Sequence, residues 1–258
     1  MRCIFISPHF DDLCFSMGGL IGKLNDFDKV AINVFTISNY IRRMSMVNRD
    51  RAFREHIISE IRREEDREFC AKYKIEQINL GLPEFLPENH SYTEFNGNIG
   101  EKIKNHIDFS EKSIVFSPLG IGEHANHRQV FDICRLLMEN GAAGEFIFYE
   151  DLPYGHRLST RFRGINKLSD FLSRHSFTNY LNILSKKDIQ RKREDIMIYE
   201  SQHVYKCPTR VKMHRYFTRV SLLRHPYEGF WIRSGCNEIS KFLSKNPHSL
   251  FSILRKLF

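Results

Sequence analysis

Two short stretches of this chain bring together side chains that can bind a metal ion: SPHFDDLCFSMGG near the N-terminus and GEHANHRQV near the middle. The first contains His9, Asp11 and Asp12, and the second contains His124 and His127. A catalytic zinc site uses three imidazole or carboxylate ligands and keeps one position open. His9 and Asp12 supply two ligands, and one histidine of the second stretch supplies the third.

The remaining polar side chains of these stretches suit proton transfer. Asp11 lies beside a ligand and is placed to take a proton from a metal-bound water. The second-stretch histidine that does not bind metal is free to stabilise an oxyanion. Each stretch alone has a plainer interpretation, because aspartates can cap a following helix and histidines can cap a helix or lie on a surface. Their joint occurrence, each after a core strand of one predicted sheet, favours a metal site.

The elements that must position these residues alternate along the chain. Apolar, strand-like runs cover residues 2–8, 29–38, 75–82, 113–119 and 145–154. Helical patterns separate them, the clearest over 48–74 and after His127, and a further helix is predicted to begin at Gly18. This order predicts an α/β fold, a Rossmann-like, doubly wound and mostly parallel sheet. Ligands of such sheets bind outside the carboxyl ends of the strands, where both stretches lie.

The charge of the chain is unevenly distributed. Residues 1–156, the predicted Rossmann-like catalytic core, have 18 Lys+Arg against 24 Asp+Glu, a net charge of −6. Residues 157–258, a basic C-terminal region with a predicted helix over 185–202, have 21 against 7, a net charge of +14. We expect this region to complete the same domain and to form part of the substrate site. The asymmetry suggests an anionic partner, such as a phosphorylated substrate, nucleic acid or a membrane, or else a solvated basic face.

Location is predicted from other features. The six cysteines show no C-x-x-C spacing, and the sequence shows neither a signal peptide nor a long apolar run, which predicts a cytoplasmic protein. Residues 249–258, SLFSILRKLF, combine apolar and basic side chains. This tail is expected either to pack on the sheet or to contact the inner membrane surface.

The two stretches also resemble the motifs of a known family. SPHFDDLCFSMGG is similar to the P-H-P-D-D-E-x-x-x-x-G-G signature of the PIG-L/LmbE-like zinc-dependent N-deacetylases, and GEHANHRQV is similar to their H-P-D-H motif. The likeness continues through IRREEDREFCAKYKIEQINLGLPE, FYEDLPY and KREDIMIYESQ, and so covers roughly residues 1–202.

The resemblance implies a role for each matching residue. His9, Asp12 and His127 would be the zinc ligands. Asp11 would be the general base, and His124 would stabilise the tetrahedral intermediate or protonate the leaving amine. Arg62 matches an arginine that faces the substrate; the alternative is an exposed helix residue paired with a neighbouring carboxylate, either Glu65 or Asp66.

Three positions depart from the family pattern: Phe10, Leu13 and Asn126 replace a proline, a glutamate and an aspartate. None of them removes a ligand or the base. Leu13 loses a polar contact near the metal. Asn126 is expected to remove a carboxylate that would tune the pKa of His124.

The resemblance implies a zinc-dependent hydrolase that removes an N-acetyl group from an amino sugar or its conjugate, including a nucleotide-, phosphate- or lipid-linked one, and releases acetate. Two alternatives stay open. One is an amide hydrolase of the same family that acts on a sugar–thiol conjugate. The other is a basic nucleic-acid-binding protein on a hydrolase-like core, which the intact set of five polar residues disfavours.

Overall fold

A computed structural model describes residues 1–41, 50–84, 92–107, 113–203, 216 and 226–234. Seven strands form one sheet in the order β3-β2-β1-β4-β5-β7-β6. Their bounds are β1 Arg2–Ser7, β2 Asp28–Ile37, β3 Ile75–Pro83, β4 Ser113–Pro118, β5 Glu145–Tyr149, β6 Phe177–Ile183 and β7 Tyr227–Arg233. Strands β1 to β5 are parallel to one another, whereas β7 pairs antiparallel with both β5 and β6. The predicted α/β class and mostly parallel sheet are confirmed.

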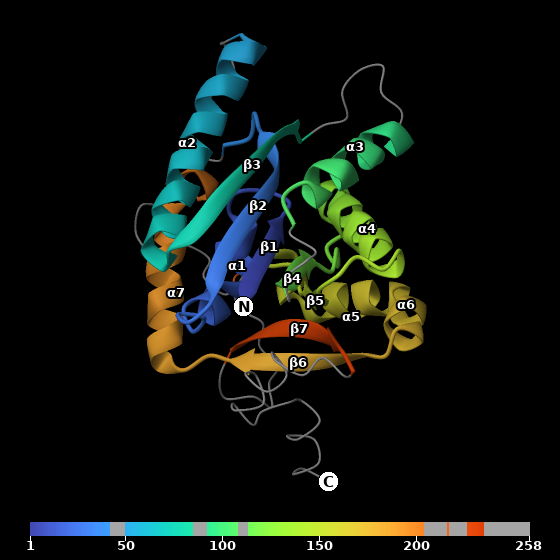
Figure 1. Cartoon of the computed structure of the whole chain (residues 1–258). Helices are drawn as coiled ribbons and strands as arrows, with labels where there is room; N and C mark the ends of the chain where they lie inside the picture. Colours follow the sequence, from blue (N-terminus) through green and yellow to red (C-terminus); the bar gives the residue numbers. More distant parts are fainter. Residues whose placement is uncertain (42–49, 85–91, 108–112, 204–215, 217–225, 235–258) are drawn as a thin grey trace.

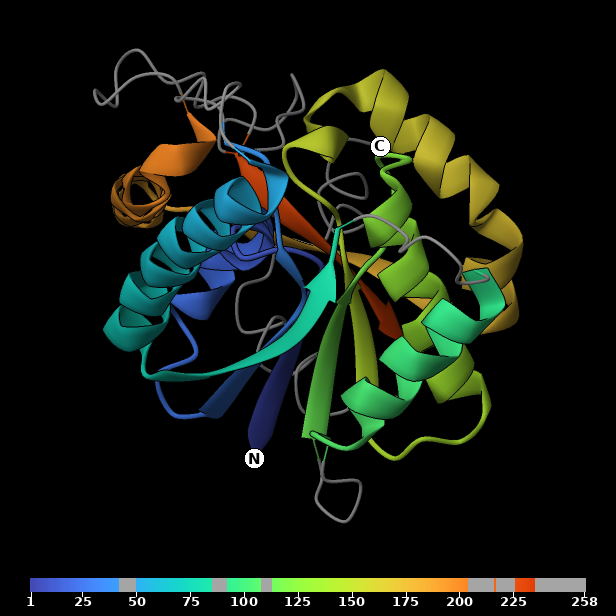
Figure 2. The same cartoon turned by 90° about the horizontal axis from the view of Figure 1, so that it is seen from above.

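Helices cover both faces of the sheet (Figures 1 and 2). One face carries α1 Asp12–Ile21, α2 Arg51–Tyr73 and α7 Lys186–Ile198. The other carries α3 Tyr92–Lys104, α4 Ala125–Glu139, α5 Leu158–Lys167 and α6 Ser169–Arg174. Two short 3-10 turns, η1 Tyr154–His156 and η2 Glu200–Gln202, complete the described elements. No helix in the described part of the chain has both the length and the apolar character to cross a membrane.

The order of the strands creates a switch point in the sheet. The chain leaves β1 toward β2 and β3 on one side, then returns to place β4 and β5 on the other side of β1. The crossover loops of β1 and β4 therefore diverge and open a crevice at their carboxyl ends. The chain after β1 and the chain after β4 are the two stretches that the sequence singles out.

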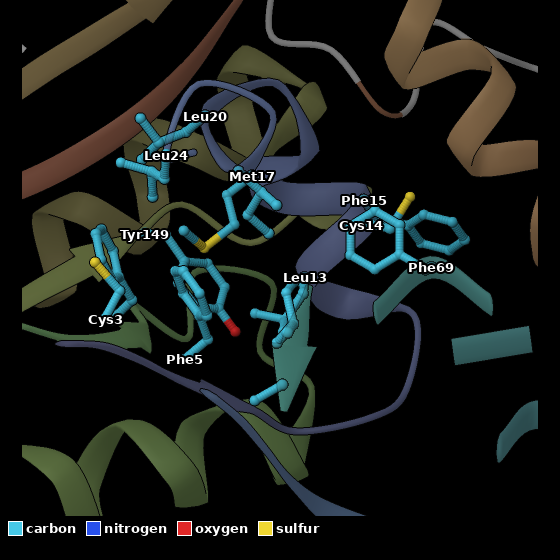
Figure 3. Packing of buried hydrophobic residues seen from close by; sticks show 14 of the residues in the cluster. Cys3, Phe5, Leu13, Cys14, Phe15, Met17, Leu20, Leu24, Phe69 and Tyr149 are labelled. Atoms are coloured by element: carbon cyan, nitrogen blue, oxygen red, sulfur yellow. The ribbon is translucent and has the colours of Figure 1, made fainter. Parts of the chain in front are cut away.

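Helix α1 begins earlier than predicted, because Asp12 rather than Gly18 starts it and the two glycines lie in its second half. Its apolar side chains, among them Leu13 and Met17, pack against Phe5 and Tyr149 of the sheet (Figure 3). The helix kinks at Met17, where φ is −140° and ψ is 19°. After the kink, the backbone N–H groups of Gly19 and Leu20 donate to the carboxylate of Glu228 on β7, at 2.8 and 2.9 Å.

The remaining differences from the sequence prediction lie at element ends and after residue 156. Strand β5 ends at Tyr149, so residues 150–153 form a loop at the carboxyl edge and Tyr154 begins η1, rather than continuing the strand. Described residues of the basic region add the strands β6 and β7 to the same sheet and the helices α5 and α6 to one of its faces. The helix predicted over 185–202 divides into α7 and η2. The tail at 249–258 lies outside the described residues.

Some charged side chains of the basic region form ion pairs with carboxylates of residues 1–156. Arg161 of α5 forms a two-point ion pair with Glu150 of the acidic half, with both N–O distances at 2.6 Å. Lys167 pairs with Glu123, again across the two halves. Cations of the basic region therefore bind the region 1–156 itself, which is one physical reason for the uneven distribution.

Candidate active site

Three predicted ligands meet at the switch point. His9 follows β1, Asp12 begins α1, and His127 lies in the first turn of α4. Asp12 Oδ2 lies 3.1 Å from His9 Nδ1 and 3.3 Å from His127 Nε2. The ligand atoms of the three residues all lie within 4.8 Å of one another, and all three residues are buried. Ligands around a tetrahedral ion with bonds of about 2.0–2.1 Å lie about 3.3 Å apart, so this donor set fits a small divalent metal.

The local sequence explains why these atoms converge. The backbone N–H of His9 donates to Asp12 Oδ2 at 2.9 Å, which closes the turn between β1 and α1. The short side chain of Asp12 is thereby aimed back toward the strand end. His127 reaches the same point because α4, whose N-cap residue is His124, begins just after β4, and β4 pairs with β1.

The outer ring nitrogen of each histidine in the cluster also has a polar neighbour. Asp151, in the loop after β5, accepts a hydrogen bond from His127 Nδ1 at 2.6 Å and another from the backbone N–H of Ile121 at 3.1 Å. Asn126 Nδ2 lies 3.0 Å from His9 Nε2. Such outer contacts fix the ring orientation and tautomer of a metal-binding histidine. The sequence analysis missed Asp151, although its place after a parallel strand is the signal that found His9.

Asp11 lies beside this cluster and is held by Arg62. The guanidinium of Arg62 donates to Asp11 Oδ1 at 3.1 Å, to Glu84 Oε1 at 2.5 Å and to Ser38 Oγ at 2.7 Å. Arg62 is 4% exposed, so the alternative of an exposed helix arginine paired with Glu65 or Asp66 is wrong. It faces the site, and its charge is shared by two carboxylates.

The electrostatics of the cluster follow from burial and pairing. Burial raises the pKa of Asp11, although Arg62 opposes the shift. Burial alone would raise the pKa of Asp12, but pairing with His127 and His9 outweighs it and holds the pKa well below the usual value. Burial would lower the pKa of His127, yet Asp12 and Asp151 raise it to about 10. A bound cation would displace that proton, because metal ligation and protonation compete.

His124 faces the same space beside the cluster. The centroid of its ring lies 5.3 Å from that of His9 and 5.2 Å from that of His127. Burial lowers the pKa of His124 to about 4, and the charges of His9 and His127 act in the same direction. Its Nδ1 is buried and has no hydrogen-bond partner among the described residues. Among the described residues, the side chain of Asn126 has its polar contact with His9. Its influence on the pKa of His124 stays a prediction.

A cavity of about 280 Å³ opens on these groups. Its lining combines carboxylates, two histidines, one arginine, two amides and several aromatic rings: His9, Asp11, Asp12, Phe15, Tyr40, Arg62, Glu84, His124, Asn126, Pro153, Tyr154, Gln202 and Tyr216. Five of the six predicted site residues line the cavity, and His127 lies behind it, fully buried. The sequence analysis assigned no role to Glu84, Tyr154, Gln202 or Tyr216, which reach the cavity from separate segments.

The fold and the cluster define an α/β protein with a buried His–Asp–His cluster that could hold a metal ion at the carboxyl edge of a parallel sheet. The profile of the PIG-L family, described as GlcNAc-PI de-N-acetylase, matches residues 4–138, about half of the chain. The chain belongs to the PIG-L family. The matched region runs from β1 through α4 and contains all six predicted site residues, whereas Asp151 lies beyond it.

One individual protein that the chain resembles is a deacetylase. The chain is 30% identical over 169 residues to the 2'-N-acetylparomamine deacetylase of Streptomyces fradiae. The aligned residues make up 59% of this chain and 57% of that protein. The chain therefore matches a little over half the length of this relative.

Solved structures share the fold at lower identity. A deacetylase of teicoplanin biosynthesis superposes with a TM-score of 0.65 at 18% identity, over 92% of this chain and 100% of that chain. The 4-carboxy-2-hydroxymuconate hydratase of Pseudomonas putida superposes with a TM-score of 0.53 at 13% identity, over 92% and 99%. At these identities the likeness shows a common fold, and activity must be argued from the site.

Proposed function

We propose that this protein is a metal-dependent N-deacetylase that removes the acetyl group of an N-acetylated amino sugar and releases acetate. One observation carries the proposal: a buried carboxylate, Asp11, stands next to the His9–Asp12–His127 cluster on the wall of one cavity. That pairing of a proton acceptor with a Lewis-acid site is what hydrolysis of an amide requires. Membership of the PIG-L family supports the choice of amide and of sugar.

The donor set supports zinc as the metal. Two imidazoles and one carboxylate, all buried, are the set that catalytic zinc sites use with one position left open. When bound, the metal supplies Lewis acidity, which polarises an amide carbonyl and makes water more acidic. Sites of this composition also accept other first-row divalent ions.

The side chains of the chain itself supply the proton transfers. Asp11 takes the proton of the attacking water on its carboxylate, which Arg62 keeps in place through Oδ1. His124, with a pKa lowered to about 4, is a neutral imidazole at pH 7. A neutral ring still has one N–H, so His124 donates a hydrogen bond to the developing oxyanion. Asp11 then delivers its proton to the leaving nitrogen.

The described lining of the cavity favours a neutral or positively charged amino sugar. Asp12 would share its charge with the bound ion, whereas Asp11 and Glu84 both pair with the single guanidinium of Arg62. On that wall two carboxylates outnumber one arginine, so the ammonium or hydroxyl groups of an amino sugar complement it better than a phosphate does. The name of the Streptomyces fradiae relative, an N-acetylparomamine deacetylase, agrees with this choice.

The test is acetate release by the zinc-loaded protein from N-acetylated amino sugars, their phosphate-linked forms and a sugar–thiol conjugate. Asp11→Asn is expected to keep the metal and the fold and to lose about 10²–10⁴-fold in kcat, the usual contribution of general-base catalysis. Asp26→Asn, at an exposed turn, is the matched control and keeps the wild-type rate. Near wild-type turnover by Asp11→Asn, or no acetate from any of these compounds, would refute the proposal.

We also propose that the protein works in a reducing compartment such as the cytoplasm. Four buried cysteines, Cys3, Cys14, Cys70 and Cys134, are free thiols, which supports this location. Fractionation of cells that express the full chain tests the location, and a pellet fraction released by high salt would indicate contact with an anionic membrane surface.

A further inference from the structure

Asn126 is the residue before the metal-binding histidine of α4, yet its side chain contacts the ligand on β1. Its amide nitrogen lies 3.0 Å from His9 Nε2, and the exposed fractions of Asn126 and His9 are 6% and 7%. The first turn of α4 thus provides one ligand, His127, and a neighbour for another. A contact so well shielded from water constrains the ring of His9, because neither partner can exchange freely to solvent.

The geometry also indicates which nitrogen of His9 faces the metal. His9 Nδ1 and His127 Nε2 both approach Asp12 Oδ2, at 3.1 and 3.3 Å, so these three atoms surround the position that the metal would take. His9 Nε2 is then the outer nitrogen. A metal-binding imidazole nitrogen must be unprotonated, so the proton of His9 lies on Nε2 and needs an acceptor.

We propose that Asn126 is a positioning residue that accepts this proton's hydrogen bond through Oδ1 and so holds His9 in its metal-binding orientation. The oxygen and nitrogen of an amide exchange places by rotation of the terminal torsion, and the two orientations have the same outline. The inference rests on the proposed metal-dependent function. It deepens that function by assigning a role to a residue that departs from the H-P-D-H pattern.

The two ligating histidines are then held by groups of different strength. His127 Nδ1 donates to a carboxylate, Asp151, whereas His9 Nε2 donates to a neutral amide. Hydrogen bonds to an ionised acceptor are about twice as strong as those between neutral groups. His9 is therefore the more weakly held ligand, and a carboxylate at position 126 should strengthen it.

The first measurement is the Zn²⁺ affinity of the full chain, determined by competition with a chromophoric chelator. Asn126→Leu keeps the size of the side chain but removes the acceptor, and it should lower the affinity about 10- to 100-fold, the usual effect of losing an outer partner of a metal ligand. Asn126→Asp should raise the affinity above that of the wild type. Asp151→Asn, the reciprocal change at the other histidine, should lower it.

A second measurement separates the hydrogen bond from the added charge, because any carboxylate near a cation raises its affinity. In the Zn²⁺-loaded, ¹⁵N-histidine-labelled protein, the Nε2–H resonance of His9 should shift downfield in Asn126→Asp, while the Nδ1–H resonance of His127 stays in place. Asp151→Asn should move the His127 resonance and leave that of His9 unchanged.

The outcomes distinguish a failure of the positioning role of Asn126 from a failure of the proposed metal-dependent function. A folded Asn126→Leu protein with wild-type Zn²⁺ affinity would overturn the positioning role. If that variant does not fold, an unmoved His9 resonance in Asn126→Asp would overturn it instead. A wild-type chain that binds no Zn²⁺ at all would overturn the proposed function, and this inference with it.

Discussion

Arg62 and Asp11 form a buried ion pair at the edge of the metal-binding cluster, with 3.1 Å between Arg62 Nη2 and Asp11 Oδ1. The same guanidinium reaches Glu84 at 2.5 Å, so one cation stands between two carboxylates on the cavity wall. Nearly all of its side chain is inaccessible to water. The pair holds Asp11, the proposed general base, in position, and the charge of Arg62 opposes the rise in the pKa of Asp11 that burial causes.

Arg62→Met should lower the free energy of unfolding by about 3–5 kcal/mol, because it leaves two buried carboxylates without a counter-charge. Arg63→Met is the matched control, since Arg63 pairs with Glu60 at the exposed surface and should contribute at most about 1 kcal/mol. Steady-state kinetics then separate two roles. Loss of kcat, by about 10²-fold, would indicate that Arg62 positions Asp11. A raised KM with unchanged kcat would contradict this and favour direct substrate contact.

Asp66 gives a pH dependence of stability that is independent of the metal site. Its carboxylate is fully buried and accepts hydrogen bonds from Asn33, Gln77 and Tyr199, at 2.8, 2.5 and 2.8 Å. Burial nevertheless raises the pKa of Asp66 to about 6, and the negative charge of Asp11 acts in the same direction. The neighbouring thiol of Cys70 is neutral and supplies no positive charge. The folded protein thus holds this proton to higher pH than the unfolded chain, whose aspartate has a pKa of 3.8.

Stability from this group is complete below about pH 4 and is lost as the pH rises toward 6. The loss should reach about 3 kcal/mol, from 1.36 kcal/mol for each pKa unit. Denaturant unfolding of the wild type and of Asp66→Asn between pH 4 and pH 7, in the presence of a chelator, measures it. The difference in unfolding free energy between the two proteins should move in favour of the variant as the pH rises. A difference that stays constant would show that Asp66 is ionised throughout.

Gly19 is required by packing rather than by its backbone angles. A Cβ at this position would lie 2.4 Å from Leu184 Cδ2 and 3.0 Å from both carboxylate oxygens of Glu228. Gly19→Ala should therefore destabilise the fold by about 1–3 kcal/mol, the usual cost of overpacking. Gly97→Ala in α3 is the control, because a Cβ there meets nothing within 4 Å and should stabilise the helix by up to about 1 kcal/mol. Equal melting temperatures for the two variants would show that α1 can move away from β7.

The excess of carboxylates in the cavity lining predicts how KM depends on the charge of the substrate. At low ionic strength, an amino sugar with free ammonium groups should have a lower KM than its neutral analogue, and a phosphate-linked form should have a higher one. Added salt should narrow these differences, because it screens exposed charges over about 8–10 Å. Glu84→Gln should reduce the preference for the cationic sugar. A phosphate-linked sugar with the lowest KM would instead support the anionic partner that the basic region suggests.

The sequence determined the class of fold and the residues at the centre of the site, because both depend on short-range patterns. Apolar runs separated by helical periodicity predict a parallel sheet whatever the order of its strands. That sheet places His9, Asp12 and the pair His124 and His127 at one edge, because residues after parallel strands share an edge, and the family resemblance selected His127 of the pair as the ligand. The chain after β1 closes its own turn through Asp12, so two ligands are positioned locally.

The tertiary structure alone decided which partners hold these groups, since each partner comes from a distant part of the chain. Asp151 meets His127 because β5 lies beside β4, and Arg62 meets Asp11 because α2 packs on the face of the sheet that α1 also covers. Asn126 reaches His9, which is far away in sequence, because the two strand ends come together at the switch point. The order of the strands depends on the summed burial of many apolar side chains, and no local pattern encodes it. The sequence therefore determined which residues could bind a metal, and the packing of the sheet decided how strongly each one is held.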